Sequence, residues 1–216
     1  MEAEPRPYTG TRTKTRAGEG RRWTVAGGIV TTDVQQTLAF SMRWISKARL
    51  YNSRSLEDAF DRYFSLFVAF NRLYSHLNRH AAHPTTGDRA QATSGFLSAL
   101  GARRLLLAVE GNGGAADIEL LRRLIDPTAG EFFLISDTRH DLPDSLKNQE
   151  LFDNLGAQSS TTRANAVLTY LYLVRCNMFH GAKDFERRQL RIIEPATRVL
   201  QRVVGAGLAF VGEDAV

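Results

Sequence analysis

The chain has 216 residues, 43% of them hydrophobic, and a formal net charge of +5, a size and composition that suit one domain with a buried core. Its single cysteine, Cys176, excludes an intramolecular disulfide framework and favours a reducing, cytoplasmic location. No apolar run approaches the roughly 18–20 residues that span a bilayer, and the polar N-terminus lacks the apolar segment of a secretory signal, so we expect neither.

Residues 1–22 are rich in Thr, Arg, Gly and Pro and show almost no apolar periodicity, which predicts a disordered tail. Six basic and three acidic residues give this tail a charge of +3 and leave +2 for the rest of the chain. It is either a solvated end or an arm that follows phosphates and adds salt-sensitive affinity. The body alone is not basic enough to indicate a nucleic-acid partner.

We expect one helical domain over residues 23–216, because no linker-like composition divides it; two small domains are the alternative. Residues 23–34 favour a short extended piece or hairpin around Gly27 and Gly28, and a helix is predicted from Gln35 to Leu50. Ser55 is placed to cap the next helix, which runs to about residue 82. Its apolar stripe consists of Leu56, Phe60, Phe64, Phe67, Tyr74 and Leu77.

The middle of the chain predicts shorter pieces. A helix is predicted over residues 90–109, followed by a glycine-rich break at 111–114. A second helix is predicted over 117–125, capped by Asp117 and stopped by Pro127. An apolar piece of uncertain type follows at 131–135, and loops around one short helix are predicted over 137–157.

Two further core helices are predicted, over residues 161–180 and 184–204. Gly181 suits the position after the first of these, since glycine takes the left-handed conformation without steric cost. Pro195 is expected to kink the second. Because no alternating pattern or internal repeat is present, the fold class is predicted to be all-α, an irregular helical bundle.

Two polar residues fall where these stripes predict hydrophobic ones. Asn71 lies four residues after Phe67 and seven after Phe64, and Arg175 lies four residues after Leu171. A buried amide or guanidinium needs a specific partner, so each residue either makes a structural hydrogen bond or lines a cleft. Their positions on the two best-defined helices favour a shared site.

His180 follows Arg175 by five residues, or about 140° of helical rotation, so the two side chains do not share a face of an ideal helix. They can converge if the arginine reaches around, if the last turn loosens, or if a second copy of the chain supplies one of them. A helix C-terminus favours a protonated imidazole, and a histidine there often acts only as a cap.

The run YLVRCNMFHGAK (residues 172–183) resembles the signature of HEPN domains, in which an Arg precedes a His by a short spacing and Phe-His-Gly closes the helix. The earlier run FVAFNRLY (residues 67–74) is similar to the first helix of Apea-like HEPN proteins. The resemblance covers residues 55–82 and 161–204 and leaves the centre and the tail unexplained. Many active members have a polar residue where this chain has Cys176.

Active HEPN proteins are metal-independent endoribonucleases that work as homodimers, often as toxins or phage-defence factors. The resemblance implies that His180 is the general base or acid and that Arg175 neutralises charge on the phosphorane. It implies further that Asn71, Asn177 and Lys183 bind substrate. RNA and a nucleotidyltransferase-like antitoxin are the expected partners, and neither a metal nor a cofactor is expected.

Two alternatives stay open. The chain is a non-catalytic HEPN module that binds RNA, a nucleotide or a protein partner, or it is a helical regulator whose basic tail contacts DNA. No helix-turn-helix pattern supports the regulator.

Overall fold

The computed structural model describes residues 32–51, 55–129, 132–135, 142–179 and 187–213. These residues form helices and no strand, which confirms the all-α class. No helix in these ranges is both long enough and apolar enough to cross a lipid bilayer. The predicted tail, nearly all of the extended piece before Gln35, and the motif residues His180, Gly181 and Lys183 lie outside the described residues.

In chain order the helical elements are α1 (Asp33–Ala48), α2 (Leu56–His80), α3 (Asp88–Ala90), a π-helical turn (Gln91–Gly95), α4 (Phe96–Leu100), α5 (Ala102–Glu110), α6 (Gly114–Leu124), α7 (Asp144–Lys147), α8 (Gln149–Leu155), α9 (Ser160–Phe179), a 3-10 turn (Arg187–Gln189) and α10 (Leu190–Glu213). Most of these elements follow one another closely, but residues 125–143 separate α6 from α7.

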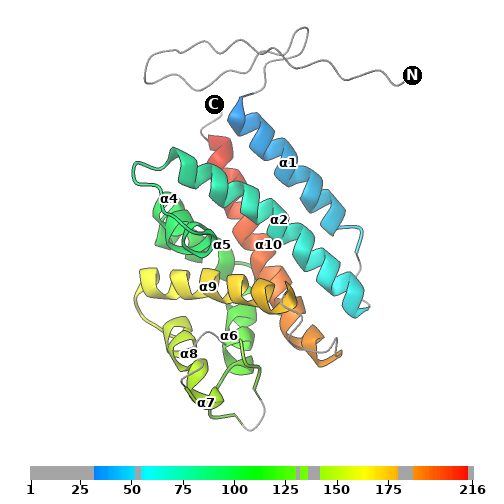
Figure 1. Ribbon diagram of the computed structural model, residues 1–216, viewed down its shortest axis with the longest axis vertical. Helices are drawn as coiled ribbons and strands as arrows, with labels where there is room; N and C mark the ends of the chain where they lie inside the picture. Colours follow the sequence, from blue (N-terminus) through cyan, green and yellow to red (C-terminus); the bar gives the residue numbers. More distant parts are fainter. Residues whose placement is uncertain (1–31, 52–54, 130–131, 136–141, 180–186, 214–216) are drawn as a thin grey trace, which may run out of the picture.

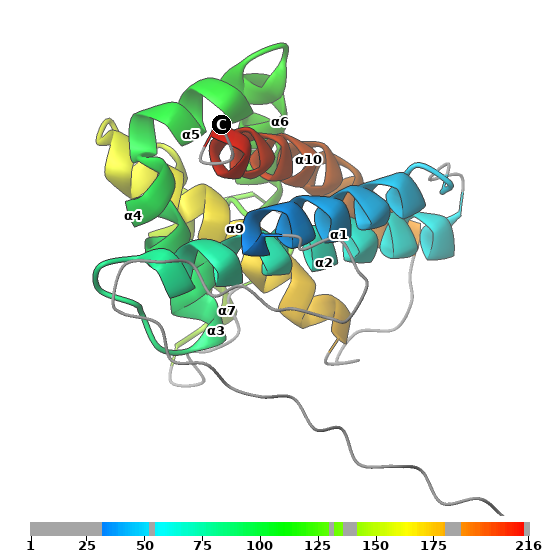
Figure 2. The same cartoon turned by 90° about the horizontal axis from the view of Figure 1, so that it is seen from above.

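Helix α10 is the centre of the bundle. The antiparallel pair α1 and α2 packs on one side of it, and α5 and α6 pack on the other (Figures 1 and 2). Helix α9 crosses α2 and α10 at a steep angle, with α8 against its outer side (Figure 1). Aromatic rings fill the interior near α2, where Phe70 and Phe96 meet edge to face at 5.0 Å between centroids.

Both long N-terminal helices begin at a residue that caps them through its side chain. The Thr32 hydroxyl accepts from the backbone N–H of Gln35, whose side chain accepts in return from Thr32 N–H, a complete capping box for α1. The Ser55 hydroxyl accepts from Asp58 N–H at the start of α2, so the predicted cap is confirmed.

The helix predicted over residues 90–109 is interrupted. Gly101 has φ +85° and ψ 135°, a conformation that favours glycine, and it separates α4 from α5. The sequence pattern is apolar on both sides of this residue, so periodicity alone did not reveal the break. The loop predicted over residues 137–157 likewise contains two short helices, α7 and α8, instead of one.

Two other expectations about helix ends were wrong. Helix α6 begins at Gly114, so Asp117 lies inside its first turn and does not cap it. The last helix continues nine residues beyond Val204, to Glu213. Gly207, which looks like a breaker in the sequence, is a packing position: a Cβ there would meet Phe96 at 3.1 Å.

Candidate functional site

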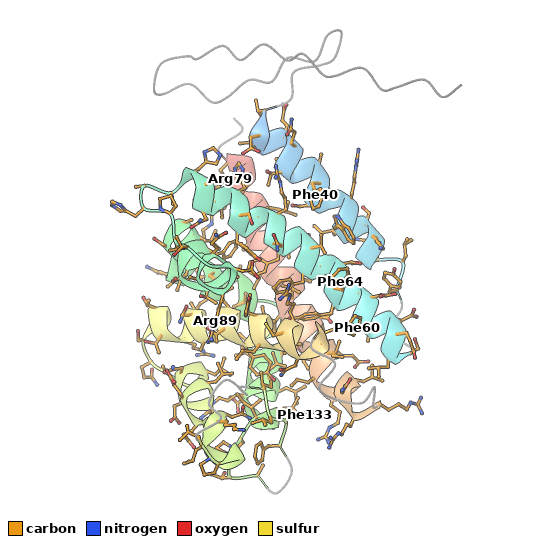
Figure 3. The ribbon with its side chains drawn as sticks, in the orientation of Figure 1. Phe40, Phe60, Phe64, Arg79, Arg89 and Phe133 are labelled. Carbon is orange, nitrogen blue, oxygen red and sulfur yellow. The ribbon has the colours of Figure 1, made fainter. Side chains whose placement is uncertain are left out.

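The buried face of α2 differs from the predicted stripe at one edge. Tyr63, Phe67 and Phe70 are almost fully buried, whereas Phe64 is half-buried at the edge of the pair with α1, where its ring meets Trp44 (Figure 3). Asn71 follows Phe64 by two helical turns and is exposed, so the expectation that it belongs to the buried face was wrong. The stripe itself is largely confirmed, because Leu56, Phe67, Tyr74 and Leu77 are buried; only Phe60 and Phe64 lie at its edge, and the second of these misplaced Asn71.

Arg175 joins the two segments that carry the motifs. It is half-buried near the end of α9, and its guanidinium carbon lies 5.7 Å from the Phe67 ring centre and 5.9 Å from that of Tyr172. The two rings are 6.3 Å apart, so the cation lies beside a pair of rings, one from each helix. This arrangement places Arg175 against α2, as its position four residues after Leu171 suggested.

Asp88 adds a carboxylate to the same surface. It accepts hydrogen bonds from the hydroxyls of Tyr74, on α2, and Tyr172, on α9, with the Tyr172 bond at 3.1 Å. Burial, together with the charge and hydrogen bond of Asp88, raises the pKa of Tyr172 to about 12, so this phenol stays protonated and donates. Sequence reasoning missed Asp88, because its role depends on two distant tyrosines whose hydroxyls need an acceptor.

Tyr63 fixes how α2 and α9 pack together. Its hydroxyl, completely enclosed, donates a 2.6 Å hydrogen bond to the backbone carbonyl of Leu171, one turn before Arg175. Burial raises the pKa of Tyr63 well above its usual value. The bond fixes the position, along the axis of α2, of the turn of α9 that carries Arg175.

Asn177 lies on a different side of α9. It follows Arg175 by two residues, or about 200° of rotation, and its amide donates to the backbone carbonyl of Ile135 at 3.1 Å. It also lines an apolar cavity of about 60 Å³ bordered by Phe60 and Phe133 (Figure 3). The structure therefore gives Asn177 a packing role and does not bring it beside Arg175.

The described part of the site consists of a cation beside two aromatic rings and a neighbouring carboxylate, Asp88, while Asn71 is exposed on α2 and accepts a hydrogen bond from the Ser75 hydroxyl. Such a surface can bind an anion at the guanidinium and stack a flat group beside it. Cys176 is half-buried, and its sulfur lies 4.0 Å from Arg175 Nη1. His180 and Lys183, the other two predicted site residues, lie outside the described residues.

No family model, curated protein or solved structure matches this chain.

Proposed function

We propose that the protein is a metal-independent endoribonuclease of HEPN type. The observation that supports this most directly is the meeting of the two motif segments, with Arg175 of one seated on Phe67 of the other. These segments are about a hundred residues apart in the sequence and were singled out separately. Their contact supports the proposal because a planar guanidinium held at one place is well suited to bind a phosphate.

In the proposed reaction, the 2′-hydroxyl of RNA attacks the adjacent phosphorus and the 5′-oxygen of the next nucleotide leaves. His180 takes the 2′-hydroxyl proton or supplies a proton to the leaving oxygen, and Arg175 neutralises the charge on the phosphorane. The products are a 2′,3′-cyclic phosphate and a 5′-hydroxyl. Asn71, exposed one turn after Phe67, is accessible to a bound nucleotide, and Lys183 contributes positive charge to the substrate.

A homodimer is part of this proposal. Arg175 and His180 are separated by about 140° on an ideal helix, so a second chain that presents its own α9 supplies the missing group to each centre. A toxin or phage-defence role in the cytoplasm, with a nucleotidyltransferase-like antitoxin as partner, belongs to the same proposal.

The test compares the full-length protein with His180→Ala on RNA in the presence of EDTA. We expect cleavage by the natural chain and a loss of about a hundredfold or more in the variant, the usual contribution of a general acid or base. His83→Ala, which removes an exposed histidine elsewhere, is the matched control and should cleave normally. Equal cleavage by His180→Ala and the natural chain would overturn the catalytic role.

A second candidate is a non-catalytic module that binds RNA through the same surface. The structural bond from Asn177 to Ile135 favours it, because that bond commits one of the expected substrate residues to packing. Binding without cleavage, weakened by removal of residues 1–22, would support this candidate over the ribonuclease.

A further inference from the structure

Two histidines and an aspartate meet where the beginning of α1 lies beside the end of α2. Asp33 Oδ2 is 3.0 Å from His76 Nδ1 and 3.1 Å from His80 Nε2. All three potential ligand atoms lie within 4.8 Å of one another. The cluster lies at the C-terminal end of α2, where Arg79 is labelled in Figure 3, and its first histidine follows Phe67 by nine residues, or about 14 Å along the helix.

The spacing suits metal coordination. His76 and His80 are four residues apart on one face of α2, and Asp33 approaches from a different helix. Ligands at about 2.0–2.2 Å from a tetrahedral Zn²⁺ are separated by roughly 3.4 Å. The two oxygen-to-nitrogen distances are already slightly below this separation, so small side-chain rotations open a space for an ion between the three atoms.

The residues around the cluster orient its carboxylate. Arg72 contacts the other oxygen of Asp33, Oδ1, at 3.1 Å, which fixes the carboxylate and leaves Oδ2 facing the histidines. The His76 side chain is only 4% exposed, so it is a rigid ligand. His80 is 59% exposed and leaves one side open to water as a fourth ligand.

Arg79 opposes metal binding. Its guanidinium lies 3.4 Å from Asp33 Oδ2, the oxygen that a metal needs, and its side chain is 50% exposed. A bound cation would displace this flexible side chain and repel it. The same contact provides a specific test, because removing the Arg79 charge should improve metal binding.

We propose that Asp33, His76 and His80 bind a Zn²⁺-class transition-metal ion that links the start of α1 to the end of α2. Two imidazoles and one carboxylate suit Zn²⁺ or Co²⁺, whereas Mg²⁺ and Ca²⁺ require a set of oxygen ligands. The ion has a structural role and contacts none of the residues proposed for RNA cleavage, so the site does not depend on that chemistry.

The experiment titrates the full-length protein with Co²⁺, following the visible absorption of the protein-bound ion, and then with Zn²⁺ in competition. We expect one ion per chain, with an affinity at least about tenfold weaker in His80→Ala, since even outer partners of a metal contribute that much. His83→Ala, three residues further along, is the matched control and should bind like the natural chain.

Asp33→Asn provides a second ligand variant, and circular dichroism verifies that each variant is folded. Arg79→Gln should tighten binding several-fold. No binding by the natural chain, equal binding by His80→Ala and the natural chain, or displacement of Co²⁺ by equimolar Mg²⁺ would overturn the proposal.

Discussion

The guanidinium carbon of Arg175 lies 5.7 Å from the centre of the Phe67 ring, so a side chain of α2 supports the cation of α9. Most of the hydrophobic contact between these helices serves stability alone. The contact between Phe67 and Arg175 also determines where the guanidinium charge lies at the protein surface.

Replacing Phe67 with Leu should reduce RNA cleavage more than a core substitution of equal size. Loss of the ring removes a cation–π contact of about 0.5–2 kcal/mol, which corresponds to roughly twofold to thirtyfold in kcat/KM. Phe96→Leu is the control, because Phe96 is also fully buried and its ring packs against Phe70. Equal losses of kcat/KM in both variants, measured well below their Tm, would rule out a positional role for Phe67.

Tyr63→Phe should lower the free energy of unfolding by about 1 kcal/mol, because it deletes the buried hydrogen bond to Leu171. The loss stays modest, since the Leu171 carbonyl keeps its bond within the helix. Urea unfolding followed by circular dichroism measures it. Tyr51→Phe, just after α1, serves as the comparison, and a change as large there would show that the Leu171 bond is not the cause.

Asp117 should make the bundle sensitive to acid. Burial alone would raise the pKa of Asp117, but hydrogen bonds from Arg198 Nε at 2.8 Å and Arg202 Nη1 at 2.9 Å outweigh it and hold the pKa below its usual value. The stabilisation is therefore complete above the unfolded-chain pKa, about 3.9, and disappears as the pH falls through the lower folded-state pKa.

Asp117→Asn should accordingly cost about 2 kcal/mol at pH 7, with the difference from the natural chain shrinking below pH 4. Urea unfolding at pH 7, 5, 4 and 3.5 tests this. Asp153→Asn, at an exposed carboxyl, should change stability by less than about 0.5 kcal/mol. A difference for Asp117→Asn that stays constant down to pH 3.5 would contradict the ion-pair explanation.

Two glycine substitutions should have opposite effects. A Cβ on Gly114 would lie 1.8 Å from the Val109 carbonyl oxygen, so Gly114→Ala should destabilise by about 2 kcal/mol or more. A Cβ on Gly205 would meet nothing within 4 Å, so Gly205→Ala should stabilise α10 by about 0.5–1 kcal/mol. Thermal unfolding distinguishes them, and a stabilised Gly114→Ala would mean that the junction of α5 and α6 rearranges.

Helix α2 could be predicted from the sequence because it combines a cap with an apolar repeat over many turns. Ser55 and the stripe after it placed α2 within two residues of its observed ends. The break at Gly101 could not be predicted in this way, because the residues on both sides fit one continuous apolar face. Asp117 resembled a cap until the structure showed that its partners are arginines about eighty residues later.

A site residue could be predicted only where a polar side chain falls at a position that the helical pattern assigns to an apolar one. Arg175 stood out in this way, and it is half-buried against aromatic rings. Asn71 was misplaced because Phe64, at the edge of a helix pair, was counted as a core residue. The sequence around Asp88 does not indicate its role in the site, since its two tyrosine partners belong to different helices.

The bond from Tyr63 to Leu171 also bears on local unfolding. If α9 frays from its C-terminal end, the opening must break this bond before it passes the turn that begins at Leu171. Backbone amides before Leu171 should therefore exchange with deuterium much more slowly than those after Arg175. Beyond Arg175 the core still holds α9 at Asn177, which donates to the Ile135 carbonyl, and at Met178, which packs against the core, so fraying that stops at these two residues leaves the Tyr63 bond and the arginine in place.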